Sequence, residues 1–110
     1  DVVCPMVYPS HWEPQAKYGR APYRTVLNAV QRIKQNQPPK HSTRIIPYIE
    51  MSNYRIHHTR NETKHYILRQ IQAAQDSGSD GWYAWSASNY YKLLFEVLDT
   101  MQQTGHLKRA

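Results

Sequence analysis

Two of the eight acidic residues stand where a carboxyl group could do chemistry. Glu50 ends the apolar run 44–50, and Glu13 lies in the polar stretch that follows the apolar run 2–8. If these runs are parallel strands, their carboxyl ends meet at one face, where barrel enzymes place their active sites. A carboxyl group held there can act as a general acid or base. Glu50 is therefore a better catalytic candidate than Glu13, and the other interpretation is that Glu50 is a hydrogen-bonding or structural carboxylate in the cleft. The other acidic residues are expected before strands or on outer helices: Asp1, Glu62, Asp76, Asp80, Glu96 and Asp99.

Polar and aromatic side chains cluster near the same predicted strand ends. Tyr8, Ser10 and His11 offer phenol, hydroxyl and imidazole groups, which donate and accept directional hydrogen bonds. Trp85, near the end of the run 81–87, offers a flat apolar face on which the ring of a ligand could stack. The alternatives are that Tyr8 and Ser10 only satisfy backbone groups, and that Trp85 packs in the core. Trp82, earlier in the same run, is expected in the core.

Neither a metal site nor a serine nucleophile is expected. His57, His58 and His65 do not have the i, i+4 spacing of a zinc helix, and the adjacent pair points in different directions. Ser10 precedes His11, but the Gly-x-Ser-x-Gly turn of serine hydrolases is absent from the sequence. No cofactor is therefore predicted.

The residues named so far lie on a pattern of three strands, each followed by a helix. Strands are expected near 2–8, 44–50 and 81–87, and helices near 22–36, 61–77 and 89–104. Pro22 suits the first turn of a helix. Thr59 and Glu62 have capping-box spacing, and Gly78 can end the second helix in the left-handed conformation.

The third helix is expected to begin with a cap from Ser88 or Asn89 and to end at Gly105. In each helix, apolar residues recur at spacings of three and four, which predicts one buried stripe. The stripe residues are Val26, Leu27, Val30 and Ile33, then Ile67, Ile71 and Ala74, then Leu94, Val97, Leu98 and Met101.

Successive strand–helix units predict an α/β fold with parallel strands, because a strand that returns in the same direction needs a long crossover. Three parallel strands leave two open edges, and near-continuous apolar strands are usually covered on both faces. We therefore expect further strands from a longer parent chain or from a partner chain. The start at Asp1, inside an apolar stretch, also suggests an excised or processed piece. Cys4 is expected to be buried in the first strand.

Composition leaves two other classes of function open. The formal net charge of +6 permits nucleic-acid binding, with aromatic rings stacking bases, but Lys and Arg form no continuous stripe. A small self-standing α/β protein that pairs its strand edges in an oligomer is the other alternative. The single cysteine excludes an internal disulfide, and no apolar run approaches the roughly 20 residues that span a bilayer.

Several short motifs agree in order and spacing with one known family. They are VCPMVYPSH over 3–11, Tyr18-Gly19, Pro22-Tyr23, IPYIE over 46–50, QIQA over 70–73, the Gly and Trp residues of 78–85, and Ser88-Asn89. In these motifs the sequence resembles the putative glycoside hydrolase domain family, whose members are expected to be (β/α)₈ barrels of the glycosidase superfamily. The family commonly carries Gln at the position of Glu50 and Trp at that of Tyr48, so Glu50 does not simply inherit a catalytic role.

This resemblance implies that residues 1–110 are one partial domain, the last three βα units of a TIM (β/α)₈ barrel. The parent protein would be a glycoside hydrolase that binds, and hydrolyses by carboxylate chemistry, a polysaccharide or oligosaccharide. A non-catalytic carbohydrate-binding barrel is the alternative, and this piece alone is expected to be inactive. Members are expected to be bacterial and extracytoplasmic or secreted. The expected substrate-binding residues are Tyr8, Ser10, His11, Tyr48, Trp85 and Asn89.

Overall fold

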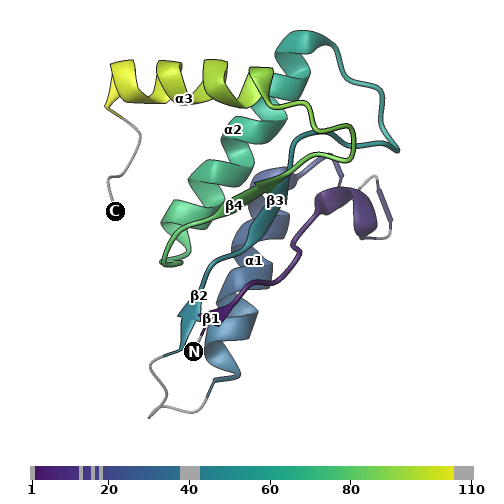
Figure 1. Cartoon of the computed structure of the whole chain (residues 1–110). Coiled ribbons are helices and arrows are strands. Elements are labelled where there is room, and N and C mark those ends of the chain that lie inside the picture. Colours follow the sequence, from purple (N-terminus) through teal and green to yellow (C-terminus); the bar gives the residue numbers. More distant parts are fainter. Residues whose placement is uncertain (1, 13, 16, 18, 38–42, 106–110) are drawn as a thin grey trace.

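The structure is a computed structural model that describes residues 2–12, 14, 15, 17, 19–37 and 43–105. It contains short strands, a 3₁₀ turn and three α-helices (Figure 1). Helices alternate with extended segments, as the sequence predicts. The elements are β1 (Val2–Val3), η1 (Pro9–His11), α1 (Pro22–Gln35), β2 (Arg44–Ile45), β3 (Tyr48–Glu50), α2 (Arg60–Asp76), β4 (Tyr83–Trp85) and α3 (Lys92–Thr104).

The extended segments are parallel, which confirms the α/β prediction. β1 pairs with β2 and β3 pairs with β4, both in parallel register. A further parallel bridge joins Met6 to Tyr48, and the Val7 N–H donates to the Tyr48 carbonyl at 3.2 Å. The middle segment, β2 with β3, therefore lies between residues 2–7 on one side and β4 on the other.

The strands are shorter than the continuous runs expected over 2–8, 44–50 and 81–87. Pro5 and Pro47 interrupt the first two runs, because proline has no N–H to donate to the ladder. Their carbonyls still accept, from the Tyr48 N–H at 2.8 Å and from the Tyr83 N–H at 2.9 Å. The segments thus stay side by side although the regular strands end.

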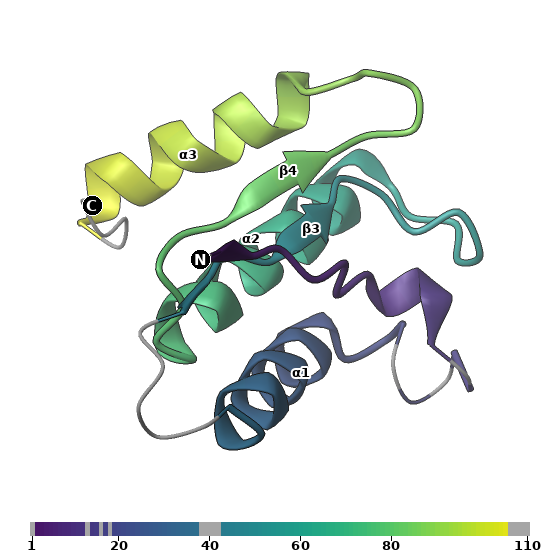
Figure 2. The same ribbon diagram turned by 60° about the horizontal axis from the view of Figure 1, so that its bottom comes forward.

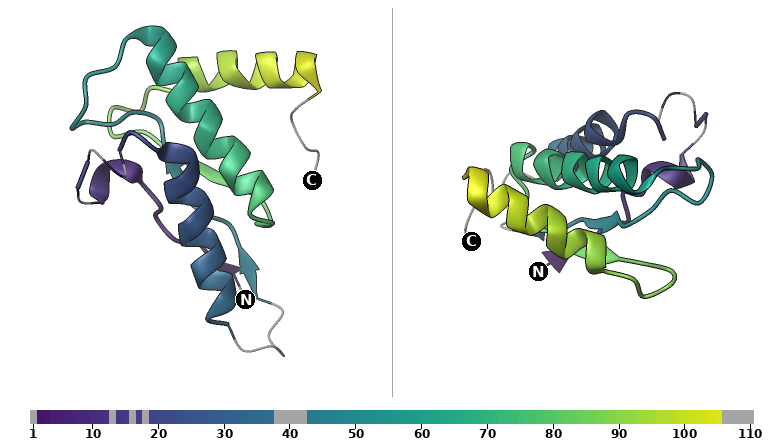
Figure 3. Two further views of the ribbon diagram at one scale, coloured as in Figure 1. Left: turned by 180° about the vertical axis from the view of Figure 1, so that it is seen from behind. Right: turned by 90° about the horizontal axis from the view of Figure 1, so that it is seen from above.

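The helices α1 and α2 cover one face of the strands. Figure 3 (left) shows them side by side in front of the strands, which lie in front of the helices in Figure 1. The core between these layers is apolar, and α3 adds to it from the far side of α2. Its fully buried members include Val26, Val30, Ile49, Ile67 and Ile71.

The opposite face of the strands is open in this chain. Val2, Met6, Tyr83 and Trp85 are 52%, 68%, 46% and 42% exposed. Cys4 is exposed as well, so the expectation that it is buried is wrong. It lies on the outermost extended segment, and neither α1 nor α2 reaches the outward side of that segment. Trp82 is partly buried against the core, as expected.

The ends of α2 follow the sequence, whereas the start of α3 does not. The Glu62 N–H donates to Thr59 Oγ1 and the Thr59 N–H to Glu62 Oε1, which confirms the capping box. Gly78, just after α2, has a φ of +75°. α3 begins at Lys92, so the cap expected from Ser88 or Asn89 is wrong.

The reason is a turn that closes over residues 86–90. The Tyr90 N–H donates to Ser86 Oγ at 3.0 Å, and the Asn89 N–H donates to the Ser86 carbonyl at 3.1 Å. Asn89 has a φ of +56°, a left-handed conformation that a right-handed helix cannot contain. The helix therefore starts only after this turn.

None of the helices in the described part of the chain is long and apolar enough to cross a membrane.

Asp80 joins the amino ends of the second and third extended segments. Its Oδ2 accepts from the Ile45 N–H at 2.8 Å, and its own N–H donates to the Ile45 carbonyl at 2.8 Å.

Asp80→Ala should lower the free energy of unfolding by about 1–2 kcal/mol, because the Ile45 N–H loses a charged acceptor. Urea denaturation measures this. Asp99→Ala, at an exposed position of α3, is the control, and an equal loss in both variants would contradict the assignment.

Candidate functional site

The carboxyl ends of the three extended segments meet at one end of the molecule. η1 and the loops that follow β3 and β4 lie together there (Figure 2). Glu50 is the register partner of Trp85, and the Met51 N–H donates to the Trp85 carbonyl at 3.1 Å. The ring of Tyr8 stacks on that of Trp85, with centroids 5.4 Å apart and planes 15° from parallel. Residues from all three segments are thus in contact.

Glu50 is the buried centre of this end of the molecule. Only 2% of its surface is exposed. Oε1 accepts from the Ser10 N–H at 2.7 Å and from the Tyr66 hydroxyl, and Oε2 accepts from Ser10 Oγ at 2.7 Å. The carboxylate therefore ties η1, which follows the first segment, to α2, which follows the second.

Burial raises the pKa of Glu50 above its ordinary value. Hydrogen bonds from Tyr66 and Ser10, with a smaller contribution from His11, favour the charged form but do not cancel the effect of burial. The pKa of Tyr66 is also raised, first by burial and then by the Glu50 charge. The tyrosine thus remains a hydrogen-bond donor to the carboxyl group.

Gln70 holds the backbone of Glu50. Its Oε1 accepts from the Glu50 N–H at 3.0 Å, and its Nε2 donates to the Glu50 carbonyl at 2.8 Å. In a sheet, a neighbouring strand would supply the acceptor for the Glu50 N–H and the donor for the Glu50 carbonyl. The first segment does not continue as a strand beside Glu50, because Pro9 has no N–H and the chain turns into η1 at that residue. The amide of Gln70 therefore takes the place of the missing strand.

Sequence reasoning assigned no role to Tyr66 or Gln70. Both lie on the buried side of α2 with Ile67 and Ile71, and Gln70 is 0% exposed. A glutamine inside an otherwise apolar helical stripe was the available signal, because a buried amide needs partners.

Four rings form what we call the aromatic row: Tyr54, His11, Tyr8 and Trp85. The ring of His11 is edge-on to those of Tyr8 and Tyr54, with centroid distances of 5.2 Å and 6.1 Å. Tyr54 is 75% exposed and Trp85 42%, whereas Tyr8 is 3% exposed and lies between them. Within the row, only Tyr8 is buried, whereas His11, Tyr54 and Trp85 are exposed. Sequence reasoning missed Tyr54.

Side-chain amide groups stabilise the loop that carries His11 through hydrogen bonds. Gln15 Nε2 donates to the carbonyls of Pro9 at 2.9 Å and Trp12 at 2.6 Å, and Asn53 Nδ2 donates to Gln15 Oε1 at 3.1 Å. Gly19 packs against both amides, since a Cβ there would lie 2.1 Å from Gln15 Oε1 and 2.9 Å from Asn53 Nδ2. A side chain at position 19 would therefore displace these two amide groups.

The remaining expected site residues lie around the row. Tyr48 is half-buried and its ring contacts Tyr83 at 5.2 Å, two residues before Glu50. Asn89 is exposed in the turn before α3, and its side chain makes no hydrogen bond with the described residues of the row. Glu13 lies outside the described residues. Within the described residues, no three His, Cys, Asp or Glu side chains are grouped to hold a metal ion.

A glutamine at position 50 could keep the same partners. Its Oε1 would accept from the Ser10 N–H and Tyr66, and its Nε2 would donate to Ser10 Oγ. We expect Glu50→Gln to change the free energy of unfolding by less than about 1 kcal/mol near neutral pH, and Glu50→Ala to lower it by about 3 kcal/mol or more. The alanine variant leaves the buried donors of Ser10 and Tyr66 without an acceptor.

The pH dependence of stability shows whether the negative charge on Glu50 stabilises or destabilises the folded protein. The folded-state pKa of Glu50 is raised, so the wild type loses stability relative to Glu50→Gln as pH rises from 4.5 through the folded pKa. Urea denaturation across this range measures the difference. A wild type that gains stability relative to the glutamine variant with rising pH would contradict this account.

Comparison with known proteins gives one match. The model of the family described as "Putative glycosyl hydrolase domain" matches residues 1–91. No curated protein and no solved structure matches the chain. The family match spans β1 to the turn before α3, and so includes Glu50, its partners and the whole aromatic row. The chain belongs to this glycosyl hydrolase domain family.

Proposed function

We propose that this chain is the last three βα units of a glycosidase-type (β/α)₈ barrel, whose parent protein binds and hydrolyses a polysaccharide. Family membership and the parallel βα order support this proposal. The open sheet face supports it too, because apolar side chains such as Val2 and Met6 are suited to an interior. The remaining strands would come from the parent chain.

The aromatic row is the observation that carries sugar binding. Trp85 and Tyr54 present exposed rings at the carboxyl ends of the segments, and apolar faces of sugar rings stack on such surfaces. The exposed imidazole of His11 lies between them and can exchange hydrogen bonds with hydroxyl groups. Tyr8 and Ser10 are buried, so we propose that they support the row instead of contacting the sugar. Tyr48 and Asn89 would flank the bound chain.

We propose a positioning role for Glu50. A carboxylate offers about four acceptor sites, and Ser10 and Tyr66 occupy three of them. The 2% exposure of Glu50 also leaves little access for a glycosidic oxygen. Glycoside hydrolysis usually needs two carboxyl groups about 5–9.5 Å apart, so this proposal places the catalytic pair elsewhere in the parent protein.

The catalytic role expected for Glu50 from the sequence is the second candidate. Its raised pKa favours it, since a general acid must hold a proton before it donates one. Glu50→Gln in the full-length parent separates the two roles. A positioning residue is rescued by glutamine, so turnover stays within about threefold, whereas loss of a catalytic acid lowers turnover by about a hundredfold or more.

Trp85→Ala should weaken polysaccharide binding by about three- to tenfold, the size of one aromatic stacking contact. Depletion of the chain from solution by insoluble cellulose, chitin, xylan and starch measures this binding. Phe95→Ala is the matched control, because Phe95 is an aromatic residue that is 64% exposed on α3 and is not part of the aromatic row. Binding should change little between low and high salt. Equal losses in both variants, or no binding to any of the four, would count against the proposed site.

A further inference from the structure

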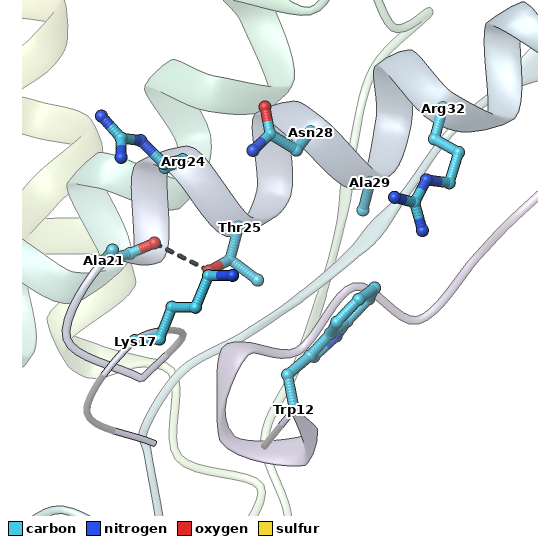
Figure 4. A pocket seen from close by; sticks show the side chains of 8 residues that line it. All are labelled: Trp12, Lys17, Ala21, Arg24, Thr25, Asn28, Ala29 and Arg32. Carbon is cyan, nitrogen blue, oxygen red and sulfur yellow. Dashed lines mark hydrogen bonds between the residues drawn. The ribbon is translucent and has the colours of Figure 1, made fainter. Parts of the chain in front are cut away.

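A separate basic pocket lies between the loop after η1 and the first turns of α1 (Figure 4). Its volume is about 200 Å³. Trp12 forms one wall, and Thr25 and Ala29 of α1 form the opposite one. Lys17 and Arg32 reach in from the two ends, whereas Arg24 stands at the outer edge of the helix (Figure 4).

Small side chains on α1 make this space. Thr25 and Ala29 are one helical turn apart, so they leave a shallow groove between longer neighbours. The Thr25 hydroxyl donates to the Ala21 carbonyl at 2.9 Å and thus points along the helix. The wall opposite Trp12 is therefore mostly methyl groups, which suits the flat side of a ring.

Among the described residues that line the pocket, every charged side chain is basic. Lys17, Arg24 and Arg32 line it, and α1 contains no acidic residue. Among the described residues, Arg24 and Arg32 take part in no ion pair. A guanidinium pairs with a carboxylate or sulfate through two parallel hydrogen bonds. The pocket is therefore built for an anionic group next to an aromatic face.

One short loop carries residues of both the pocket and the strand-end site. Trp12 directly follows His11 of the aromatic row, and its carbonyl accepts from Gln15 at 2.6 Å. The two rings are thus held by the same fixed segment.

We propose that this pocket binds one anionic sugar ring, a uronic acid or a sulfated sugar, of the polysaccharide. The ring stacks on Trp12, and Arg32 and Lys17 bind its carboxylate or sulfate. The inference rests on the proposed function only for the statement that the ligand is a sugar. The volume fits a single ring, because pockets for larger ligands measure about 300–1,000 Å³.

A nucleic acid is less well served by these residues. Single-stranded nucleic acids are bound by a basic groove with several stacking rings in succession. Here one indole lies beside one short pocket, and His11, the nearest ring of the aromatic row in the sequence, contacts Tyr8 and Tyr54 edge-on. The structure therefore favours a sugar, and an oligonucleotide serves as a test ligand.

The experiment follows the three indole N–H resonances of the chain by NMR, assigned with Trp→Phe variants. The probes are a galacturonic acid tetramer, its methyl ester, a sulfated galactan oligomer without carboxylates, and a thymidine oligonucleotide. We expect an acidic or sulfated sugar to shift the Trp12 resonance and the methyl ester to bind about tenfold more weakly. Which of the two anionic sugars binds more tightly identifies the anionic group.

Arg32→Gln should weaken this binding about tenfold, as expected for loss of a charge-assisted pair. Arg44→Gln is the matched control, because Arg44 is exposed at the opposite ends of the strands and its loss changes the net charge equally. Equal binding of acid and methyl ester, equal effects of the two arginine variants, or tighter binding of the oligonucleotide would each overturn the inference.

The two sites can fail separately. If neutral polysaccharides bind through Trp85 but no anionic sugar shifts Trp12, the pocket inference is wrong and the proposed function stands. If anionic sugars shift Trp12 and Trp85→Ala changes no binding, the pocket stands and the strand-end site does not.

Discussion

The structure depends on the buried carboxyl group of Glu50. Removing a charged group from water costs several kcal/mol, and such burial is tolerated only where the group has close polar partners. Ser10 and Tyr66 supply three hydrogen bonds, and Gln70 pairs with the backbone on the same residue. These contacts join β3 and α2, which are consecutive elements, to η1, whose Ser10 lies 40 residues before Glu50.

The geometry of the exposed surface follows from this junction. Ser10 sits between Tyr8 and His11, so its two bonds to Glu50 fix the backbone that carries both rings. Tyr8 then supports Trp85, and Gln15 fixes the continuation to Trp12. The strand-end row and the basic pocket are thus two faces of one loop, and the buried carboxyl group determines where that loop lies.

Local sequence patterns predicted the helices, the parallel α/β order and the position of Glu50, because periodicity, capping residues and strand ends are local signals. The partners of Glu50 come from residues 40 positions before it and 16 after it, and no local pattern shows such a contact. The predicted burial of Cys4 and the predicted start of α3 were wrong for a related reason. The exposure of Cys4 depends on which face of the strands the helices cover. The start of α3 depends on hydrogen bonds to Ser86, which form a turn where a helix cap was expected.

The central claim is that Glu50 is a buried carboxyl group bonded to Ser10 and Tyr66. The most direct measurement is an NMR titration of the Glu50 side-chain carboxyl carbon together with the Ser10 amide proton. We expect the carboxyl group to titrate above its ordinary pKa and the Ser10 amide to follow with the same midpoint. A Glu50 that titrates at or below its ordinary pKa, with a Ser10 amide that does not respond, would contradict the account.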